Sequence, residues 1–251
     1  MRLGKNDCLM ILLCCVFMFM AMGAMGRGSK RAKTLICQSN LRKLGQIATL
    51  YAQENDGKGF SLEYANMWCQ RLDEYTNAVD SILLCPETVS RDYDEYGSYR
   101  YGDSRTPWMW NYNREEQRIG TYAFNGWLYI RESYYGSEEK NFKDFNEIQK
   151  PSRTPVFADG NWVDTWPDES DEITAECDLT GEATGHHENG MMVRVTMDRH
   201  YGVTNVVFAD GHAEAVPLSK LWSLNWHKGW QPKYNVKRED GSPIYKANSC
   251  E

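Results

Sequence analysis

An apolar run near the N-terminus constrains the fold of this chain more than any other feature. It reads CLMILLCCVFMFMAMGAM, from Cys8 to Met25, and contains no charged residue. As an α-helix the run would extend roughly 27 Å at about 1.5 Å per residue, close to the thickness of a bilayer's hydrocarbon core. A helix buried in a soluble domain would need polar residues on its outer face, and this run offers none. We therefore expect residues 1–28 to form a single-pass anchor.

A cleaved signal peptide is the alternative to an anchor. Ala21-Met22-Gly23 would then supply the small residues of the cleavage site. Both alternatives export the rest of the chain. Basic residues flank the run on both sides, so charge alone does not fix its orientation in the membrane.

Charge is distributed unevenly along the 251 residues. Residues 1–43 contain eight Lys and Arg against one acid, a charge of +7, and the total of −7 leaves −14 for the remainder. Basic residues beside an apolar run suit anionic lipid headgroups, which makes the lipid bilayer the expected partner. The acidic remainder argues against nucleic acid as a partner.

The segment that follows the run is predicted to be an amphipathic helix. Its apolar residues recur at spacings of four, three, four and three, which places them on one helical face: Cys37, Leu41, Leu44, Ala48 and Tyr51. The helix should end at Asn55-Asp56-Gly57, because Gly supplies the left-handed terminal conformation. Gly23, Gly26 and Gly28 predict a looser junction with the apolar run, since Gly costs about 1 kcal/mol relative to Ala inside a helix.

The last predicted unit is a β-hairpin. VTNVVFA, residues 203–209, is β-branched and apolar, and HAEAV, residues 212–216, alternates in polarity. Asp210-Gly211 between them suits a two-residue type I′ turn, so we expect a terminal hairpin over residues 203–216. VFADG also occurs at residues 156–160, which predicts a second strand, turn and strand.

This hairpin bears on whether the chain has a metal site. His200 precedes Asp210 by ten positions, and ten strand steps of roughly 3.3 Å would separate the two side chains by about 33 Å. A shared metal cannot bridge that distance. We therefore assign Asp210 and Gly211 to the turn, and we expect His200 to anchor the entrance of the strand by hydrogen bonding.

Several segments together resemble a known family. CQSNLRKLGQIATLYAQENDGKGF, ILLCPE, TYAFNGW, KPSRTPVFADGNW and RHYGVTNVVFADGHAEAV occur in that order between Ser29 and Trp222. They are similar to the prepilin-like proteins abundant in Planctomycetes, Verrucomicrobia and Lentisphaerae. Those proteins carry a type II secretion pseudopilin-like N-terminal helix and a C-terminal motif of His, nine residues and Asp-Gly.

The resemblance implies an α+β, type IV pilin-like fold. A long N-terminal helix, membrane-embedded in its first half, would pack on an antiparallel β-sheet with large loop insertions, and residues 29–251 would form the exported domain. Cys37, Asn40, Leu41 and Tyr51 match helix positions of the family. Cys85-Pro86 matches the family's Cys-Pro step, and its terminal motif is matched by His200, Asp210 and Gly211. The family supplies a structural role for these residues, and we expect no catalytic residue and no cofactor.

One departure from the family concerns processing. Prepilins begin their apolar run with Gly-Phe-Thr-Leu-x-Glu, but here Gly4 is followed by Lys5-Asn6-Asp7. The sequence therefore argues against cleavage by a prepilin peptidase.

Cysteine usage is compatible with export. Five cysteines lie outside the apolar run, at positions 37, 69, 85, 177 and 250, and the odd number leaves one unpaired within the chain. We predict a disulfide between Cys37 and Cys85, because the helix needs attachment to the domain and the Cys-Pro step is a loop suited to lie against it. Closing such a loop would stabilise by roughly 4 kcal/mol. No CxxC or histidine spacing predicts a zinc site, and the adjacent His186 and His187 would diverge on a strand.

An acidic stretch runs from Asp164 to Asp178, with seven acids and no Lys or Arg. A calcium site is its functional interpretation, since Ca²⁺ prefers oxygen ligands. The stretch lacks the ordered Asp-x-Asp-x-Asp-Gly spacing of a calcium loop, so we favour a solvated acidic loop.

Three functions follow from these features. The first is a pseudopilin-like structural subunit in the inner (cytoplasmic) membrane, with its C-terminal domain periplasmic or extracellular and with other pilin-like or secretion-system subunits as partners. The second is an exported glycan-binding module that uses surface Trp and Tyr as an aromatic platform. A small core is the equal alternative for five of the tryptophans: Trp108, Trp110, Trp127, Trp162 and Trp166. The third is a metal-dependent hydrolase that uses His200, Asp210 and His212.

Overall fold

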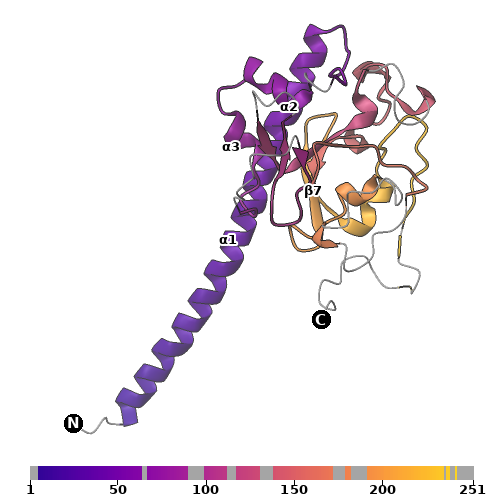
Figure 1. Ribbon diagram of the computed structural model, residues 1–251. Coiled ribbons are helices and arrows are strands. Elements are labelled where there is room, and N and C mark those ends of the chain that lie inside the picture. Colours follow the sequence, from indigo (N-terminus) through magenta and orange to yellow (C-terminus); the bar gives the residue numbers. More distant parts are fainter. Residues whose placement is uncertain are drawn as a thin grey trace.

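The computed structural model describes residues 5–63, 67–89, 99–111, 117–130, 138–171, 179–181, 191–234, 236–237 and 241, with side chains from residue 29 onward except at residue 99. The architecture is α+β, as predicted, with an N-terminal helix packed on sheets. Figure 1 shows this helix, α1, running from one side of the domain far beyond it.

Helix α1 (Lys5–Glu54) is continuous. The predicted looser junction at its glycines is therefore wrong: the backbone stays helical through residues 23–28. Its C-terminus agrees with the prediction, because Asp56 and Gly57 have positive φ and the Gly57 N–H donates to the Ala52 carbonyl over 2.7 Å. The helix therefore stops where the sequence offers residues that tolerate the left-handed conformation.

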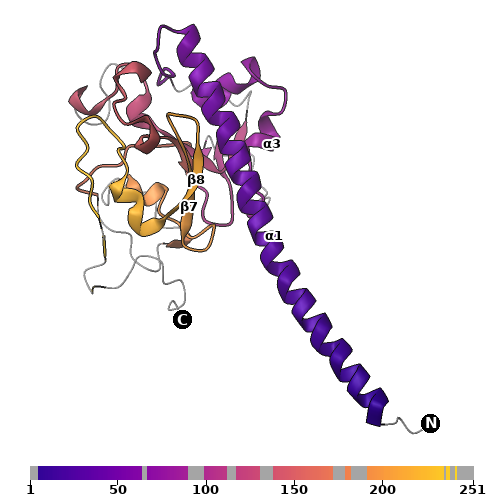
Figure 2. The same cartoon turned by 180° about the vertical axis from the view of Figure 1, so that it is seen from behind.

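The predicted apolar face of α1 packs against the domain. Cys37, Leu41, Leu44 and Ala48 are buried and belong to the core, and Tyr51 packs against it while remaining partly exposed. Figure 2 shows this part of the helix lying beside β7 (Val203–Phe208) and β8 (Ala213–Pro217). The 3.6-residue period of the sequence thus identifies the buried face.

The apolar run Cys8–Met25 lies in the half of α1 that extends away from the domain (Figure 1). The side chains of residues 5–28 are outside the described part of the structure. Among the described residues, no helix has the length and apolarity needed to cross a membrane.

The main sheet has five strands in the order β6-β4-β5-β7-β8. Besides β7 and β8 it contains β4 (Tyr122–Asn125), β5 (Pro155–Asp159) and β6 (Asp164–Thr165). All neighbouring strands pair antiparallel except β4 and β6, which are parallel. The α1 helix covers part of this sheet, and the core lies between them.

A second sheet is small and antiparallel. It consists of β1 (Tyr99–Arg100), β2 (Trp108–Trp110) and β3 (Arg118–Gly120), in that order. Short helices α2 (Trp68–Arg71), η1 (Leu72–Glu74) and α3 (Val79–Leu83) precede it in the chain. The remaining described elements are 3₁₀ helices: η2 (Gly126–Leu128), η3 (Glu138–Lys140), η4 (Phe145–Glu147), η5 (Pro151–Arg153), η8 (Met192–Arg194) and η9 (Leu218–Ser223).

The two VFADG copies fold differently. β7 and β8 form an antiparallel hairpin at the predicted position, with Val203 opposite Pro217 and Val207 opposite Ala213. A strand, a turn and a second strand also occur at the first copy, since β5 is followed by bends and then by β6, but β6 pairs parallel with β4 and not with β5. Gly160 explains the difference: a Cβ there would lie 2.4 Å from the Cβ of Ala123, so the chain runs closely past β4.

Candidate functional site

Four potential ligand side chains from distant parts of the chain meet beneath α1. The side chains of Cys37, Cys85, Asp159 and His200, called here the Cys-Asp-His cluster, place one ligand atom each within 4.8 Å of the others. All four residues are buried. Buried polar and ionisable groups are costly unless they are hydrogen-bonded, ion-paired or bound to a metal, so the distances among these four side chains indicate which of these interactions they make.

Each member is positioned by a different element. Cys37 lies on the buried face of α1, and Asp159 ends β5. Cys85 follows α3, where its N–H donates to the Thr121 hydroxyl over 2.8 Å. The neighbouring Leu84 carbonyl accepts a hydrogen bond from the Asn40 amide of α1 over 3.2 Å.

His200 is brought into the cluster by a sharp change of chain direction before β7. Tyr201 and Gly202 both have positive φ, of 59° and 84°, and the Gly202 N–H donates to the Asp198 carboxylate over 2.6 Å. Positive φ is uncommon for a residue such as tyrosine and is held here by the surrounding structure. The turn aims the His200 ring inward, under α1.

The contacts within the cluster are short. The Cys37 and Cys85 sulfurs lie 2.7 Å apart as free thiols. His200 Nε2 is 3.2 Å from Cys85 Sγ and 3.6 Å from Asp159 Oδ2. The predicted Cys37–Cys85 disulfide stays a prediction, and the two sulfurs are placed as neighbours.

The cluster shifts the pKa values of its members. Burial raises the pKa of Cys85, but its contacts with Cys37 and His200 outweigh burial and lower that pKa to about 6. Burial lowers the pKa of His200, whereas Asp159 and then Cys85 raise it, and the net shift is upward. The hydrogen bond to Cys85, followed by burial, raises the pKa of Cys37. Without a metal, the arrangement favours a Cys85 thiolate beside a protonated imidazole.

Arg199 supplies a buried positive charge next to the cluster. Its guanidinium donates to the carbonyls of Thr121, Asp103, Gly160 and Ser104 over 2.6–3.3 Å. These partners are neutral oxygens, so the guanidinium charge stays available to offset negative charge in the cluster. Two of these carbonyls adjoin the cluster, because Thr121 also accepts from the Cys85 N–H and Gly160 follows Asp159 in the chain.

The terminal motif does not form a joint site. Asp210 lies in the exposed turn between β7 and β8, where its carboxylate contacts its own neighbour His212, with Nδ1 2.5 Å from Oδ1. The His212 ring stacks on Phe208. His200 precedes the other end of β7 and joins the cluster, so the structure separates it from Asp210 and His212, the other two residues of the hydrolase hypothesis.

The turn itself differs from the predicted type I′ form. Gly211 has φ of 86°, but Asp210 is not among the residues with positive φ. The Gly211 N–H donates to the Phe208 carbonyl over 2.8 Å, which makes Ala209 and Asp210 the central residues of the turn and places Gly211 after them. The Phe208 N–H donates to the His212 carbonyl over 2.9 Å, so the loop consists of residues 209–211, one more than predicted, and within it only Gly211 has the left-handed conformation.

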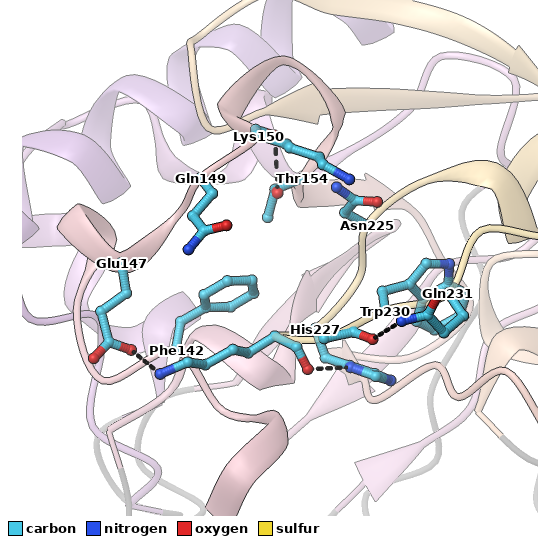
Figure 3. A pocket seen from close by; sticks show the side chains of 11 residues that line it. Phe142, Glu147, Gln149, Lys150, Thr154, Asn225, His227, Trp230 and Gln231 are labelled. Atoms are coloured by element: carbon cyan, nitrogen blue, oxygen red, sulfur yellow. Dashed lines mark hydrogen bonds and ion pairs between the residues drawn. The ribbon is translucent and has the colours of Figure 1, made fainter.

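A separate pocket of about 370 Å³ opens near the C-terminal segment (Figure 3). Gln149, Lys150 and Asn225 lie around it, with His227 and Trp230 at the side. Both ring nitrogens of His227 have partners, the Lys228 carbonyl and the Glu169 carboxylate, each at 2.9 Å. The described lining thus contains no nucleophile paired with a general base.

The acidic stretch is only partly described. Residues 172–178, and with them Cys177, lie outside the described residues, as do His186, His187 and Cys250. Asp168 and Glu169 form a second ligand group with His227, but Lys140 makes an ion pair with Asp168. A cation there would have to displace the lysine, so this group gives the calcium alternative no support.

Asp159 was not predicted as a site residue. The local pattern predicted a turn at the first VFADG copy, whereas Asp159 is the last residue of a buried strand. The sequence feature that could have indicated Asp159 is an acidic residue at the end of an otherwise apolar strand. The four cluster residues are separated by 48, 74 and 41 positions, and no local pattern indicates that they meet.

No protein-family model matches the chain, and no curated protein or solved structure is significantly similar to it. Its fold and side-chain geometry are therefore the basis for assigning a function.

Proposed function

We propose that this protein is a membrane-anchored, pseudopilin-like structural subunit of a type II secretion or type IV pilus-like envelope system. It would lie in the inner (cytoplasmic) membrane, with its C-terminal domain on the outer side. The observation that carries the proposal is the division of α1: one half packs its apolar face on the sheet, and the other half extends away from the domain as continuous helix (Figures 1 and 2). A type IV pilin-like arrangement uses its helix in this way.

The junction between the two halves fits a membrane surface. Arg27, Lys30, Arg31 and Lys33 follow within eight residues of the end of the apolar run at Met25. Lys33 forms an ion pair with Glu87 over 3.2 Å, and the Lys30 ammonium lies 3.8 Å from the centre of the Tyr201 ring. Basic residues at this end of the apolar run would contact anionic lipid headgroups, and their contacts with Glu87 and Tyr201 would fix the domain relative to the helix.

The outer face of α1 carries exposed apolar side chains. Leu35, Ile36 and Leu50 are each about half exposed or more. In a subunit that assembles through its N-terminal helix, these side chains would contact neighbouring helices, which gives them a burial partner that the chain itself does not supply.

The two other functions have less support. All nine tryptophans are buried, so none offers an exposed ring face to a sugar, and the strongly exposed aromatic side chains among the described residues are Tyr201 and Tyr234. The hydrolase hypothesis required Asp210 and His212 beside His200, and they lie at the turn at the other end of β7.

Alkaline extraction of cell membranes tests the anchor. Full-length protein should stay in the membrane pellet, and replacing Leu12 and Val16 by Arg should release it, because charges at the centre of a bilayer-spanning helix cost several kcal/mol. The control replaces Leu35 and Ile36, outside the apolar run, by Arg and should leave the protein in the pellet. A soluble mature protein that begins near Ala24 would contradict the proposal and identify a signal peptide.

A further inference from the structure

We propose that Cys37, Cys85, Asp159 and His200 bind a divalent metal ion of the zinc class, which fastens α1 to the domain. Two sulfurs, one imidazole nitrogen and one carboxylate oxygen converge within 4.8 Å of one another. Zinc is bound in structural sites by four such ligands in a tetrahedron, and thiolates select it over magnesium or calcium. The mixture of donors is thus suited to this class of ion.

Asp159 provides the first argument for a metal. One carboxylate oxygen, Oδ2, accepts from both the backbone N–H and the side-chain amide of Asn205, over 2.7 and 2.9 Å. The other oxygen, Oδ1, is buried without a hydrogen-bond partner among the described residues. A buried carboxylate oxygen left unpaired is costly, and a disulfide between Cys37 and Cys85 would bring it no donor. A cation at the centre of the cluster would compensate the carboxylate charge directly.

His200 provides the second argument, through the orientation of its ring. Nδ1 faces the Thr34 hydroxyl at 3.5 Å, and that hydroxyl donates to the Lys30 carbonyl over 3.2 Å. In the metal-bound state Nδ1 would therefore keep its proton, and Nε2 would present its lone pair to the ion. Metal-binding histidines are commonly oriented in this way by a partner on the opposite ring nitrogen.

Charge balance is consistent with a divalent ion. Two thiolates and one carboxylate with a divalent cation leave a net charge of −1 in a buried site. The Arg199 guanidinium, held beside the cluster by backbone carbonyls, supplies the matching positive charge.

The expected role of the ion is structural. Four protein ligands, all buried, leave no position for water or substrate, which is the arrangement of a structural site. Zinc–sulfur bonds of about 2.3 Å would hold the two sulfurs about 3.8 Å apart, so binding would separate them by roughly 1 Å from their present 2.7 Å. The ion would then join α1, the loop after α3, the end of β5 and the approach to β7.

Metal content and thiol state of the full-length protein, purified without chelators and under thiol protection, test this proposal. We expect one equivalent of zinc, and replacement by cobalt should give the visible bands of tetrahedral Co²⁺ with a near-ultraviolet thiolate charge-transfer band. A Cys37–Cys85 disulfide found by non-reducing peptide mapping would overturn the proposal. Two free thiols without stoichiometric metal would overturn it as well.

The chain offers a matched control for each ligand. Asp159→Asn should weaken zinc binding by roughly tenfold or more, whereas Asp210→Asn, in the other VFADG copy, should not change it. The same contrast applies to His200→Gln against His212→Gln, and to Cys37→Ser against Cys69→Ser. Near-ultraviolet circular dichroism checks that each variant is folded, and the wild-type cobalt spectrum decides the case if the ligand variants do not fold. Equal zinc affinity in a folded Asp159→Asn variant and the wild type would contradict the four-ligand site.

Discussion

Gly211 is the residue at which backbone conformation alone limits substitution. Its φ is 86°, and a Cβ built there would meet nothing within 4 Å, so any cost of replacing it is conformational and not steric. Gly211→Val should lower the free energy of unfolding by more than about 1 kcal/mol in urea denaturation, because a β-branched residue resists positive φ. Gly211→Asn is the control and should cost less, since Asn tolerates this region. Equal losses in the two variants would contradict the argument.

His200 should matter for stability far more than the exposed His212. His200→Ala leaves Asp159 and two sulfurs buried beside a cavity, and we expect a loss of about 3 kcal/mol in the free energy of unfolding. His212→Ala removes a ring at the exposed turn and should cost less than about 0.5 kcal/mol. Urea denaturation of both variants measures the difference. A His200→Ala protein as stable as the wild type would show that the cluster does not hold the fold.

Three of the four residues of the Cys-Asp-His cluster could be singled out from the sequence, and Asp159 could not. Cys37 and Cys85 were predicted as neighbours because the helix needed attachment, and His200 was predicted to anchor the chain before β7. Asp159 was missed because Asp-Gly after an apolar strand has the same local pattern whether the next strand pairs with that strand or with another one. Only the close passage of Gly160 along Ala123 decides between them, and that contact is not local in sequence.

At the scale of elements, the two faces of α1 allow a direct comparison. Leu41 is fully buried against the domain, and Leu50 is about half exposed on the same helix. Leu41→Ala should cost 2–5 kcal/mol of unfolding free energy, since it leaves a cavity, whereas Leu50→Ala should change it by less than about 0.5 kcal/mol. Thermal or urea unfolding of both variants provides the measurement. Similar values for the two would mean that α1 is not packed on the sheet as described.

A second element-level prediction concerns Asp168, which joins the segment after β6 to η3 through Lys140. Burial raises the pKa of Asp168, but the Lys140 ammonium and the Ser170 hydrogen bonds outweigh it and lower the pKa to about 2 from 3.8. Since the folded pKa lies below the unfolded one, its stabilisation is present above about pH 4 and is lost as pH falls toward 2. After allowing for its partial exposure, the loss should be roughly 1–2 kcal/mol.

Asp168→Asn should remove this contribution, so that the stability difference from the wild type shrinks as pH falls from 4 to 2. Urea unfolding at a series of pH values measures it. A constant difference between wild type and variant across that range would contradict the assignment.

Periodicity predicted the elements that are locally encoded. The buried face of α1, its end at Gly57 and the β7–β8 hairpin all follow from spacing and turn residues within a few positions. The parallel β4–β6 pairing and the three-stranded sheet depend on contacts between distant segments, and the sequence pattern did not indicate them. Helix α1 continues through three glycines, so the low helix propensity of glycine is outweighed there by the higher propensity of the flanking residues.

At the scale of the whole molecule, assembly is expected to depend on the N-terminal half of α1. The face at residues 37–51 is occupied by the chain's own sheet. A protein that begins at Ser29 should therefore be a soluble monomer, as measured by sedimentation equilibrium. A stable oligomer of this truncated form would place the assembly interface on the domain instead.

The most direct test of the pseudopilin-like account is oxidative crosslinking of full-length protein in its native membrane. The protein should form crosslinks to itself or to related subunits through Cys14 or Cys15, which lie in the apolar run of α1, and these should disappear in a Cys14→Ala, Cys15→Ala double variant. Cys69, which is buried in the domain, serves as the internal control, and its replacement should leave the crosslinks unchanged. Full-length protein that stays in the membrane and never crosslinks through the apolar run would contradict the account.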